Sequence, residues 1–413
     1  MKILKIFLIA VLILIIAGLT WATISYNFYS PKEVNTVPDK ADLKYFRESY
    51  DESREAFRTE AALLAKKYKA ASQASFNVPA KNDNDLTVDM LYIPALKNKN
   101  GLIIISSGVH GVEGFTGSAV QRMMMEEFMT DENLVSTGFL FIHGMNPYGF
   151  KNIRLMTENN VNLNRNSSQD YALYKTKNTG YPAVMDLINP QEKVDTCSVE
   201  NIFFELRSIR KIISAGMPVL RQAILQGQYE FPKGVYYGGS APEPQINSVA
   251  PFIKKFSAGY PLVMNIDLHT GYGERGTLHL FPNPIKDKKI KVMMEKVFNG
   301  YRIDWGDTDN FYTVTGDFPG YLEKIITTGA YLPMTFEYGT LDSQTTVGSI
   351  KSLHTTILEN QGFNFGYKSD KDKNEVRKNF REMYFPSSPA WRTKVISDSR
   401  IITKKTLKQF RDL

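Results

Sequence analysis

The sequence contains very little cysteine, has no strong charge bias and has no low-complexity composition. Cys197 is the only cysteine in 413 residues, which excludes an intramolecular disulfide framework and a cysteine-based zinc cluster. Lys and Arg number 50 against 43 Asp and Glu, and a net charge of +7 over this length does not indicate nucleic-acid binding. The 28 glycines and 19 prolines are near average, which excludes a collagen-like chain. With 43% apolar residues, the composition is that of a globular protein.

Only one hydrophobic run is long enough to cross a membrane. No charged residue occurs from Ile6 to Pro31, and this apolar stretch reaches the roughly 20 residues of a transmembrane helix. Lys2 and Lys5 precede it, which favours a cytoplasmic N-terminus. We expect residues 1–30 to anchor a single-pass membrane protein whose main domain is extracytoplasmic. A cleaved signal segment is the alternative, and it would make the protein secreted or periplasmic.

The rest of the chain alternates predicted strands and helices. Prolines and mixed charges at residues 31–41 indicate a linker. Apolar spacing predicts helices within 42–74 and 117–129, and short apolar runs predict strands at 86–93, 102–105, 139–142, 262–266 and 332–336. Continuous apolar strands are typical of a sheet covered on both faces. We therefore expect an α/β fold with a mixed, mostly parallel central sheet and helices on both faces, in which Pro333 disfavours a central position for the last strand.

We expect one main domain over residues 42–391. Weaker periodicity and more turns from about Asn166 to Pro251 indicate an elaboration around a site. Residues 392–413 contain many lysines and arginines and are expected to form a basic C-terminal tail. Four of the predicted strands end in polar clusters, and sites in such sheets form beyond the carboxyl ends of the strands.

Two of these clusters carry histidines suited to a metal ion. His110 and Glu113 follow the strand at 102–105 among glycines, which permit a sharp turn. His269 follows the strand at 262–266, and Asp267 is a candidate to support it from the same face. Two histidines and a glutamate, with a fourth position left to water, form a catalytic rather than a structural zinc site.

Other polar residues near the strand ends suit hydrolysis. Glu337 follows the strand at 332–336, and a carboxylate beside zinc-bound water can take its proton and deliver it to a leaving amine. Arg154 and Arg165 follow the strand at 139–142, and the guanidinium group matches a carboxylate or a developing oxyanion.

In their order along the chain, these motifs resemble those of zinc metallocarboxypeptidases of the carboxypeptidase A type, in particular a bacterial branch of that superfamily. The separation of 156 residues between Glu113 and His269 is longer than in typical digestive members, which is consistent with an insertion near 166–250 that could cap or reshape the specificity pocket. The resemblance covers about residues 86–345 and implies one zinc ion. It implies zinc ligands His110, Glu113 and His269, a general base Glu337, carbonyl polarisation by Arg154, carboxylate binding by Asn164 and Arg165, and a loosely matched mobile Tyr312.

Two positions depart from the family pattern. Gly111 and Val112 stand where the family often has an arginine, so one substrate contact is missing. Asn162 stands where an aspartate is common, and an amide should leave the ligand it supports less basic.

The function expected from this resemblance is zinc-dependent hydrolysis of an amide bond next to a free carboxylate, most simply by a metallocarboxypeptidase acting on peptides. An N-acyl amino acid amidohydrolase of the aspartoacylase type is the nearest alternative, and the matches at Arg154 and Tyr312 favour the peptidase. A non-catalytic binding protein on the same scaffold is a third. We expect no nucleic-acid partner, and contact with the membrane through the N-terminal helix.

Overall fold

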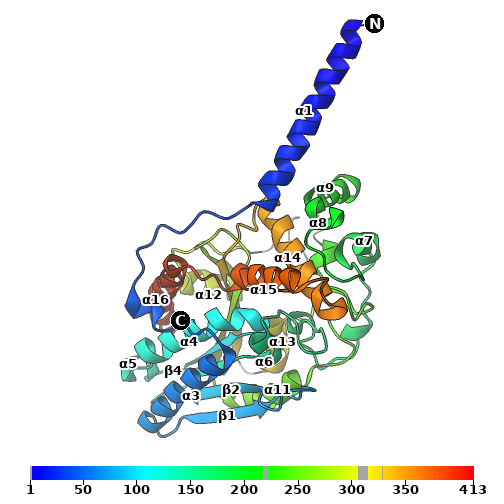
Figure 1. Ribbon diagram of the computed structural model, residues 1–413. Helices are drawn as coiled ribbons and strands as arrows, with labels where there is room; N and C mark the ends of the chain where they lie inside the picture. Colours follow the sequence, from blue (N-terminus) through cyan, green and yellow to red (C-terminus); the bar gives the residue numbers. More distant parts are fainter. Residues whose placement is uncertain (1, 217–221, 306–314, 328) are drawn as a thin grey trace.

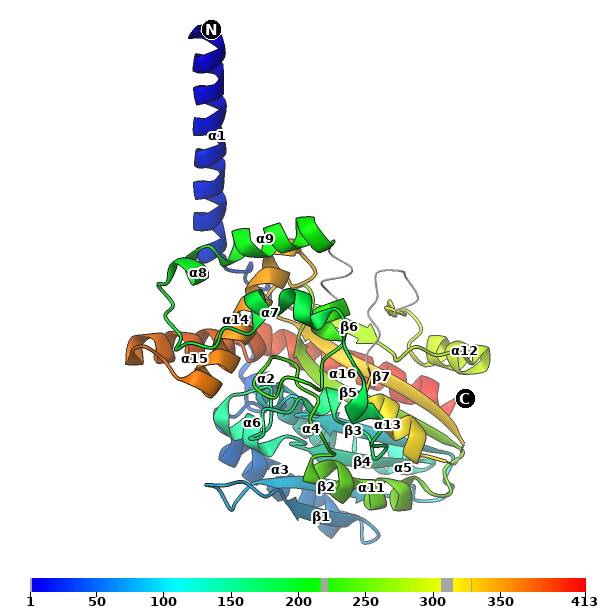
Figure 2. The same cartoon turned by 90° about the vertical axis from the view of Figure 1, so that its right-hand side faces the viewer.

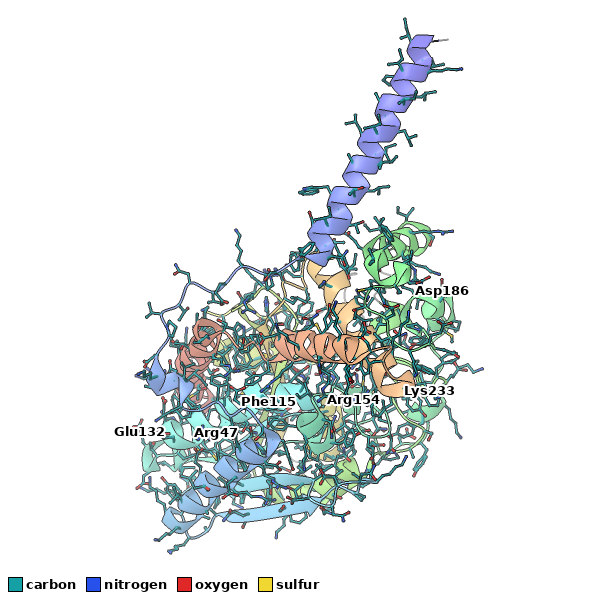
Figure 3. The ribbon with its side chains drawn as sticks, viewed as in Figure 1. Arg47, Phe115, Glu132, Arg154, Asp186 and Lys233 are labelled. Carbon is teal, nitrogen blue, oxygen red and sulfur yellow. The ribbon has the colours of Figure 1, made fainter. Side chains whose placement is uncertain are left out.

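The computed structural model describes residues 2–216, 222–305, 315–327 and 329–413, which form an α/β body with one projecting helix (Figure 1). The helix is α1 (Lys2–Asn27), and its stretch Ile3–Asn27 contains an 18-residue window with a mean hydropathy of 2.9 that is 0% buried. Along most of its length, its side chains project on all sides into the space beyond the body (Figure 3). By length and composition, α1 can be a membrane span or a signal sequence, as expected.

The described strands form one mixed sheet with the order β1-β2-β4-β3-β5-β7-β6. Its strands are β1 (Ser72–Asn77), β2 (Thr87–Ile93), β3 (Gly101–Ser107), β4 (Thr137–His143), β5 (Leu262–Gly271), β6 (Leu278–Phe281) and β7 (Ala330–Gly339). The four central strands β4, β3, β5 and β7 are parallel, whereas β1, β2 and β6 pair antiparallel at the two sides. The sheet is therefore mixed as predicted, with its parallel part confined to the centre.

Helices cover both faces of this sheet, as predicted. Every residue of β2, β3, β4 and β5 is buried, which requires cover on both sides. Helices α3 (Tyr50–Lys67), α4 (Gly114–Phe128) and α16 (Pro389–Arg411) pack on one face, and α11 (Pro244–Ser257) and α13 (Phe318–Ile325) lie on the other (Figures 1 and 2).

The remaining helices lie at the strand ends and around the edges of the sheet. They are α2 (Lys40–Leu43), α5 (Asp131–Leu134), α6 (Pro147–Asn152), α7 (Met185–Ile188), α8 (Val199–Ile202), α9 (Phe204–Ala215), α12 (Lys288–Val297), α14 (Thr346–Phe365) and α15 (Asp370–Tyr384). Short 3-10 turns occur at Gly111–Glu113, Leu163–Arg165, Leu173–Lys175 and Tyr181–Val184.

Pro333 is accommodated within β7, although it was expected to disfavour a central position. β7 lies between β5 and β6, but β6 pairs only with Thr335–Tyr338. Pro333 therefore lies in the part of β7 that has a single pairing neighbour, β5. A missing backbone N–H is tolerated where one side of a strand is unpaired.

Residues 392–413 do not form the expected tail. They belong to α16, whose side chains Trp391, Ile402 and Phe410 are buried in the main hydrophobic core. The Trp391 indole N–H also donates to the Gly339 carbonyl oxygen at 2.8 Å, which ties α16 to the end of β7. The basic residues occupy one side of a helix whose other side is apolar, so the domain extends beyond residue 391.

A second hydrophobic cluster joins the predicted insertion to α1. Residues from 181–235 pack there against Ile350 and Ile357 of α14 and against Tyr26 at the end of α1. The Tyr26 hydroxyl lies 3.0 Å from His354 Nδ1, and the His354 ring stacks on Phe204 with centroids 4.0 Å apart. The last turn of α1 is therefore packed into the body.

Replacement of Trp391 by alanine should lower the free energy of unfolding by about 3–5 kcal/mol, because it leaves a large cavity beside β7. The exposed Ile401 on the same helix offers a matched control, and Ile401→Ala should change stability by about 0.5 kcal/mol or less. Urea unfolding in detergent, followed by circular dichroism, measures both. Equal stability of the two variants would mean that α16 is not part of the core.

Candidate active site

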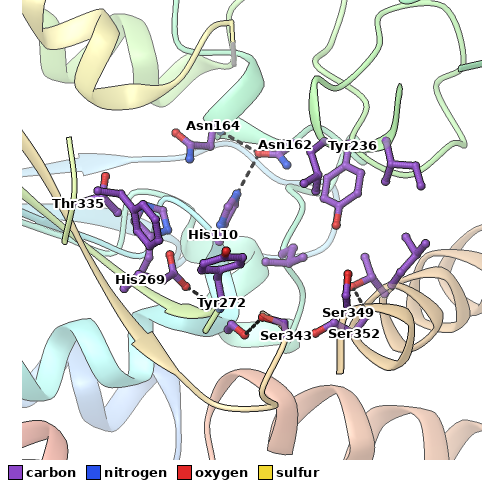
Figure 4. A pocket seen from close by; sticks show the side chains of 18 of the residues that line it. His110, Asn162, Asn164, Tyr236, His269, Tyr272, Thr335, Ser343, Ser349 and Ser352 are labelled. Atoms are coloured by element: carbon purple, nitrogen blue, oxygen red, sulfur yellow. Dashed lines mark hydrogen bonds between the residues drawn. The ribbon is translucent and has the colours of Figure 1, made fainter. Parts of the chain in front are cut away.

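The carboxyl ends of β3, β5 and β7 bring the predicted metal and acid–base residues together. His110 and Glu113 follow β3 at the start of α4, whereas His269 and Glu337 are directly paired residues of β5 and β7. All four line one cavity of about 360 Å³. Figure 4 shows His110 and His269 facing the same space.

Tight backbone packing shapes the turn that carries His110. Gly108 has φ +70, a conformation that glycine adopts without strain. A Cβ atom at Gly111 would lie 2.2 Å from the Gly149 carbonyl carbon in α6. Val112 is completely buried in the core. Close packing of α6 against the turn therefore explains why positions 111 and 112 carry no arginine.

The side chains of His110, Glu113 and His269 converge on one point. His110 Nδ1 lies 3.0 Å from Glu113 Oε1, and His269 Nδ1 lies 2.8 Å from Glu113 Oε2. One donor atom from each residue lies within 4.8 Å of the others. Glu113 is 3% exposed, and the Thr270 N–H donates to its Oε2. The predicted ligands thus form a compact and largely buried cluster.

The other ring nitrogen of each histidine contacts a supporting side chain. His110 Nε2 lies 3.2 Å from Asn162 Oδ1 (Figure 4), and His269 Nε2 lies 2.7 Å from Asp267 Oδ2. The Ser106 hydroxyl on β3 donates to the second Asp267 oxygen at 2.6 Å. Asp267 therefore faces His269 from two positions earlier on β5, as strand alternation predicted. Ser106 is a supporting residue that the sequence did not indicate.

This donor arrangement fits a metal ion. A neutral imidazole carries one N–H, so it can donate to only one of its two neighbours. If the Nε2–H groups donate to Asn162 and Asp267, both Nδ1 lone pairs face the Glu113 carboxylate. The lone pairs and the carboxylate then repel each other unless a positive charge lies between them. Two imidazole nitrogens and a carboxylate are the protein ligands of catalytic zinc sites, and supporting acceptors of this kind orient such ligands.

The charges within the cluster also act on one another. Burial alone would lower the pKa of His269, but the carboxylates of Asp267 and Glu113 raise it well above its ordinary value. Burial alone would likewise raise the pKa of Glu113, whereas the charges of His110 and His269 lower it. Each group is thus stabilised in its charged form by its neighbours.

Glu337 lies beside the cluster without being one of its three ligands. The Tyr272 N–H donates to Glu337 Oε1 at 2.9 Å. Burial, reinforced by the negative charge of Glu113, raises the pKa of Glu337 to about 8. A carboxyl group whose pKa lies near neutrality can both accept and release a proton, which suits acid–base chemistry.

Arg165 is the only lysine or arginine among the described residues that line the cavity. Its guanidinium donates to the carbonyl oxygens of Leu225 and Asn164, and these hydrogen-bond partners carry no formal charge. Asn164 also lines the cavity and accepts from the Phe318 N–H at 2.9 Å. A largely buried cation that contacts only carbonyl oxygens can attract an anionic group of a ligand.

The wall beyond Arg165 is apolar and comes from the predicted insertion and α14. It is formed by Leu187, Ile212, Ile224, Leu225, Ile350 and Leu353. Tyr236, Ser349 and Ser352 lie on the same side, across the cavity from His269 (Figure 4). The sequence indicated that the insertion could reshape a site, but it did not identify these residues.

Sequence comparison assigns the chain to a family. Residues 46–398 match the family described as "Protein of unknown function (DUF2817)". The chain belongs to the DUF2817 family. No functionally curated protein shows significant sequence similarity to it.

This DUF2817 protein is also similar to solved structures, at low identity. Bovine thrombin-activatable fibrinolysis inhibitor is 14% identical with a TM-score of 0.41, covering 81% of this chain and 99% of that one. Carboxypeptidase A from Helicoverpa armigera is 12% identical with a TM-score of 0.40, covering 81% and 73%. A succinylglutamate desuccinylase from Silicibacter sp. TM1040 is 12% identical with a TM-score of 0.34, covering 72% and 67%.

Arg154 does not reach the cavity of this DUF2817 protein, contrary to the expectation that it polarises the scissile carbonyl. Its Nε donates to Glu359 Oε1 at 2.6 Å, and its Nη2 donates to Asn160 Oδ1 at 3.0 Å. The guanidinium carbon lies 3.3 Å from the centroid of the Phe363 ring. Both Arg154 and Glu359 are buried, and neither lines the cavity. Arg154 therefore joins the loop after α6 to α14.

Tyr312, the other residue with a predicted role over the site, lies outside the described residues.

Replacement of Arg154 by methionine should lower the free energy of unfolding by about 3–5 kcal/mol, because it leaves the Glu359 carboxylate buried and unpaired. The double variant Arg154→Met/Glu359→Leu removes both charges and should recover part of this loss. Thermal unfolding with parallel elemental analysis of the folded protein measures stability and metal content. A stable Arg154→Met variant would show that the ion pair has no structural role.

Proposed function

We propose that this DUF2817 protein is a zinc-dependent hydrolase that cleaves an amide bond next to a free carboxylate, acting on peptides as a metallocarboxypeptidase. One observation carries the proposal: His110, Glu113 and His269 converge in the cavity that also contains Glu337 and Arg165. These residues supply ligands for a metal ion, a proton carrier and a carboxylate-binding cation within one space.

His110, Glu113 and His269 would hold the zinc ion, with Asn162 and Asp267 orienting the two imidazoles. When bound, zinc would supply Lewis acidity to the reacting carbonyl and lower the pKa of a water molecule. Glu337 would accept a proton from the attacking water and deliver it to the departing amine.

Arg165 and Asn164 would bind the free carboxylate of the substrate. This contact would place the bond nearest the chain end beside Glu337, which would make the enzyme exo-acting. The apolar wall formed by Leu187, Ile224 and Leu353 would receive an apolar group of the substrate.

The position of Arg154 favours a second candidate function, an N-acyl amino acid amidohydrolase. Expected participation of Arg154 in carbonyl polarisation was one of two features that distinguished the peptidase from this alternative. The buried ion pair with Glu359 keeps Arg154 out of the cavity, so this feature no longer favours the peptidase. Both reactions need the same metal ligands, proton carrier and carboxylate contact, so turnover of C-terminal peptides against N-acyl amino acids separates them.

In the same proposal, α1 crosses a membrane and the α/β domain lies on the extracytoplasmic side. Support for this orientation comes from Lys2 and Lys5, which precede the apolar stretch. Trp21 is 72% exposed near the other end of α1 and suits the interfacial layer of a bilayer.

The zinc site predicts about one zinc ion per chain in the wild type and loss of zinc in both His110→Ala and His269→Ala. Glu337→Gln should keep the zinc but lose turnover by about 10²- to 10⁴-fold, because the proton carrier is removed without a ligand. Elemental analysis and a hydrolysis assay measure these effects. Equal zinc in all variants would contradict the ligand set, and a zinc-free wild type that binds ligands without turnover would indicate a binding protein.

The carboxylate contact predicts that Arg165→Ala lowers kcat/KM by about 10- to 100-fold, mainly through KM, for substrates with a free C-terminal carboxylate. Substrates ending in a carboxamide provide the matched comparison, since they lack the anionic partner. Arg165→Lys should retain part of the affinity. An equal effect of Arg165→Ala on both substrate sets would show that Arg165 does not bind the carboxylate.

A further inference from the structure

Helix α9 presents two different faces to its surroundings. Ser208 and Ile212 on one face line the cavity of the candidate active site. On the opposite face, Arg210 is exposed and Ile213 is 80% exposed. The helix therefore forms a wall with the cavity on one side and an apolar, cationic surface on the other.

The exposed face continues into α8. Val199 is 67% exposed, and Ile202 and Phe203 are also exposed at the junction of the two helices. We call Val199, Ile202, Phe203, Arg210 and Ile213 the α8–α9 surface. Four large apolar side chains in 15 consecutive residues are unusual on a surface that faces only water.

The charge of α9 is positive. Arg207, Arg210 and Lys211 lie on this helix, and its one acidic residue, Glu205, is buried. Arg207 donates to the carbonyl oxygens of Glu200 and Asp186, and Lys211 pairs with the Asp186 carboxylate, whereas Arg210 is exposed. An exposed apolar face bordered by arginine and lysine is typical of helices that lie in a membrane interface.

The α8–α9 surface is fastened beside the end of α1. The Asn27 side-chain amide donates to the Ile202 carbonyl oxygen at 3.0 Å. His354 contacts the Tyr26 hydroxyl and stacks on Phe204, which joins α1 to the first turn of α9. Figures 1 and 2 show α8 and α9 at the base of α1, on the end of the body from which α1 projects. In Figure 2, α9 runs across the direction of α1.

We propose that the α8–α9 surface lies on the anionic phospholipid surface of the bilayer that α1 crosses. Its apolar side chains enter the interfacial layer, and Arg210 meets lipid phosphates. The geometry of α1 supports this occupant, because a helix that crosses the bilayer brings α9 to the membrane surface and roughly parallel to it. The proposal rests on α1 spanning the membrane and not on the hydrolase chemistry.

One consequence concerns the candidate active site. Since Ser208 and Ile212 line the cavity, the thickness of a single helix separates that cavity from the lipid. The site therefore works at the membrane surface.

Spin labels on single cysteines test this placement in the full chain. In a Cys197→Ser background, labels are attached at Ile213→Cys, at Leu12→Cys in α1 and at Leu63→Cys. Leu63 is 64% exposed on α3 and provides the matched control, since Figure 1 shows α3 at the end of the body remote from α1. The labelled proteins are placed in nanodiscs of phosphatidylcholine with phosphatidylglycerol, and collisions with oxygen and with a water-soluble nickel chelate are measured.

The label at residue 213 should behave like the label at residue 12, with high access to oxygen and low access to nickel, whereas the label at residue 63 should be accessible to nickel. A label at residue 213 that behaves like the one at residue 63 would overturn the proposal. So would a water-exposed label at residue 12, since α1 would then not span the bilayer.

The contribution of charge is tested separately. Arg210→Glu should reduce the protection of the residue 213 label in phosphatidylglycerol discs several-fold, and Arg210→Lys should retain it. Protection that is unchanged by Arg210→Glu would contradict the proposed anionic surface. These readouts need neither zinc nor turnover, so their outcome is independent of the hydrolase assays.

Discussion

The arrangement around the cavity depends on one buried carboxylate. Glu113 lies between two imidazoles at the end of the central strands, where an unpaired negative charge would be strongly disfavoured. Its stability requires positive charge on the side where both Nδ1 atoms lie. Asn162 and Asp267 contact the opposite nitrogens of the two rings, and Ser106 in turn positions Asp267. The two histidines thus surround Glu113, and their own supporting residues surround the histidines.

The sheet provides the rigidity that this cluster needs. Parallel pairing of β5 with β7 places His269 directly opposite Glu337, and pairing of β3 with β5 places Ser106 opposite Asp267. Because the register of a buried strand cannot slip without moving its apolar residues out of the core, these pairs are fixed by the packing of the whole sheet. Glycines at positions 108 and 111 then allow the chain to turn closely enough for His110 to join them.

A second level of organisation links the cavity to the N-terminal helix. The cluster that contains Tyr26, Phe204 and Ile350 packs the end of α1 against the same helices that line the cavity. In consequence, the position of the body relative to α1 is set by tertiary packing and not by the length of residues 31–41 alone. This packing also fixes the side of the body on which the α8–α9 surface lies, next to the end of α1.

The amino-acid sequence by itself determined five of the strands (β2, β3, β4, β5 and β7), the class of the sheet and the metal-ligand candidates. It did not indicate β1, whose first residues fall in the segment 42–74 that was expected to be helical. Runs such as those in β3 and β5 are apolar throughout because both faces are buried, and the polar residues that follow mark the strand ends. His110 and Glu113 could be found because they stand in a glycine-bounded turn after an apolar strand, and His269 because it stands in the polar end of another apolar run.

Only the tertiary structure decided which neighbouring groups share a contact. Arg154 follows the same strand as Arg165, yet Glu359, 205 positions away in α14, holds it outside the cavity. Similarly, the basic residues after 391 suggested a tail, but Trp391 and Phe410 pack into the core. In both cases the deciding partner is distant in the sequence, and a local pattern of charge carries no information about a partner that only the folded chain brings near.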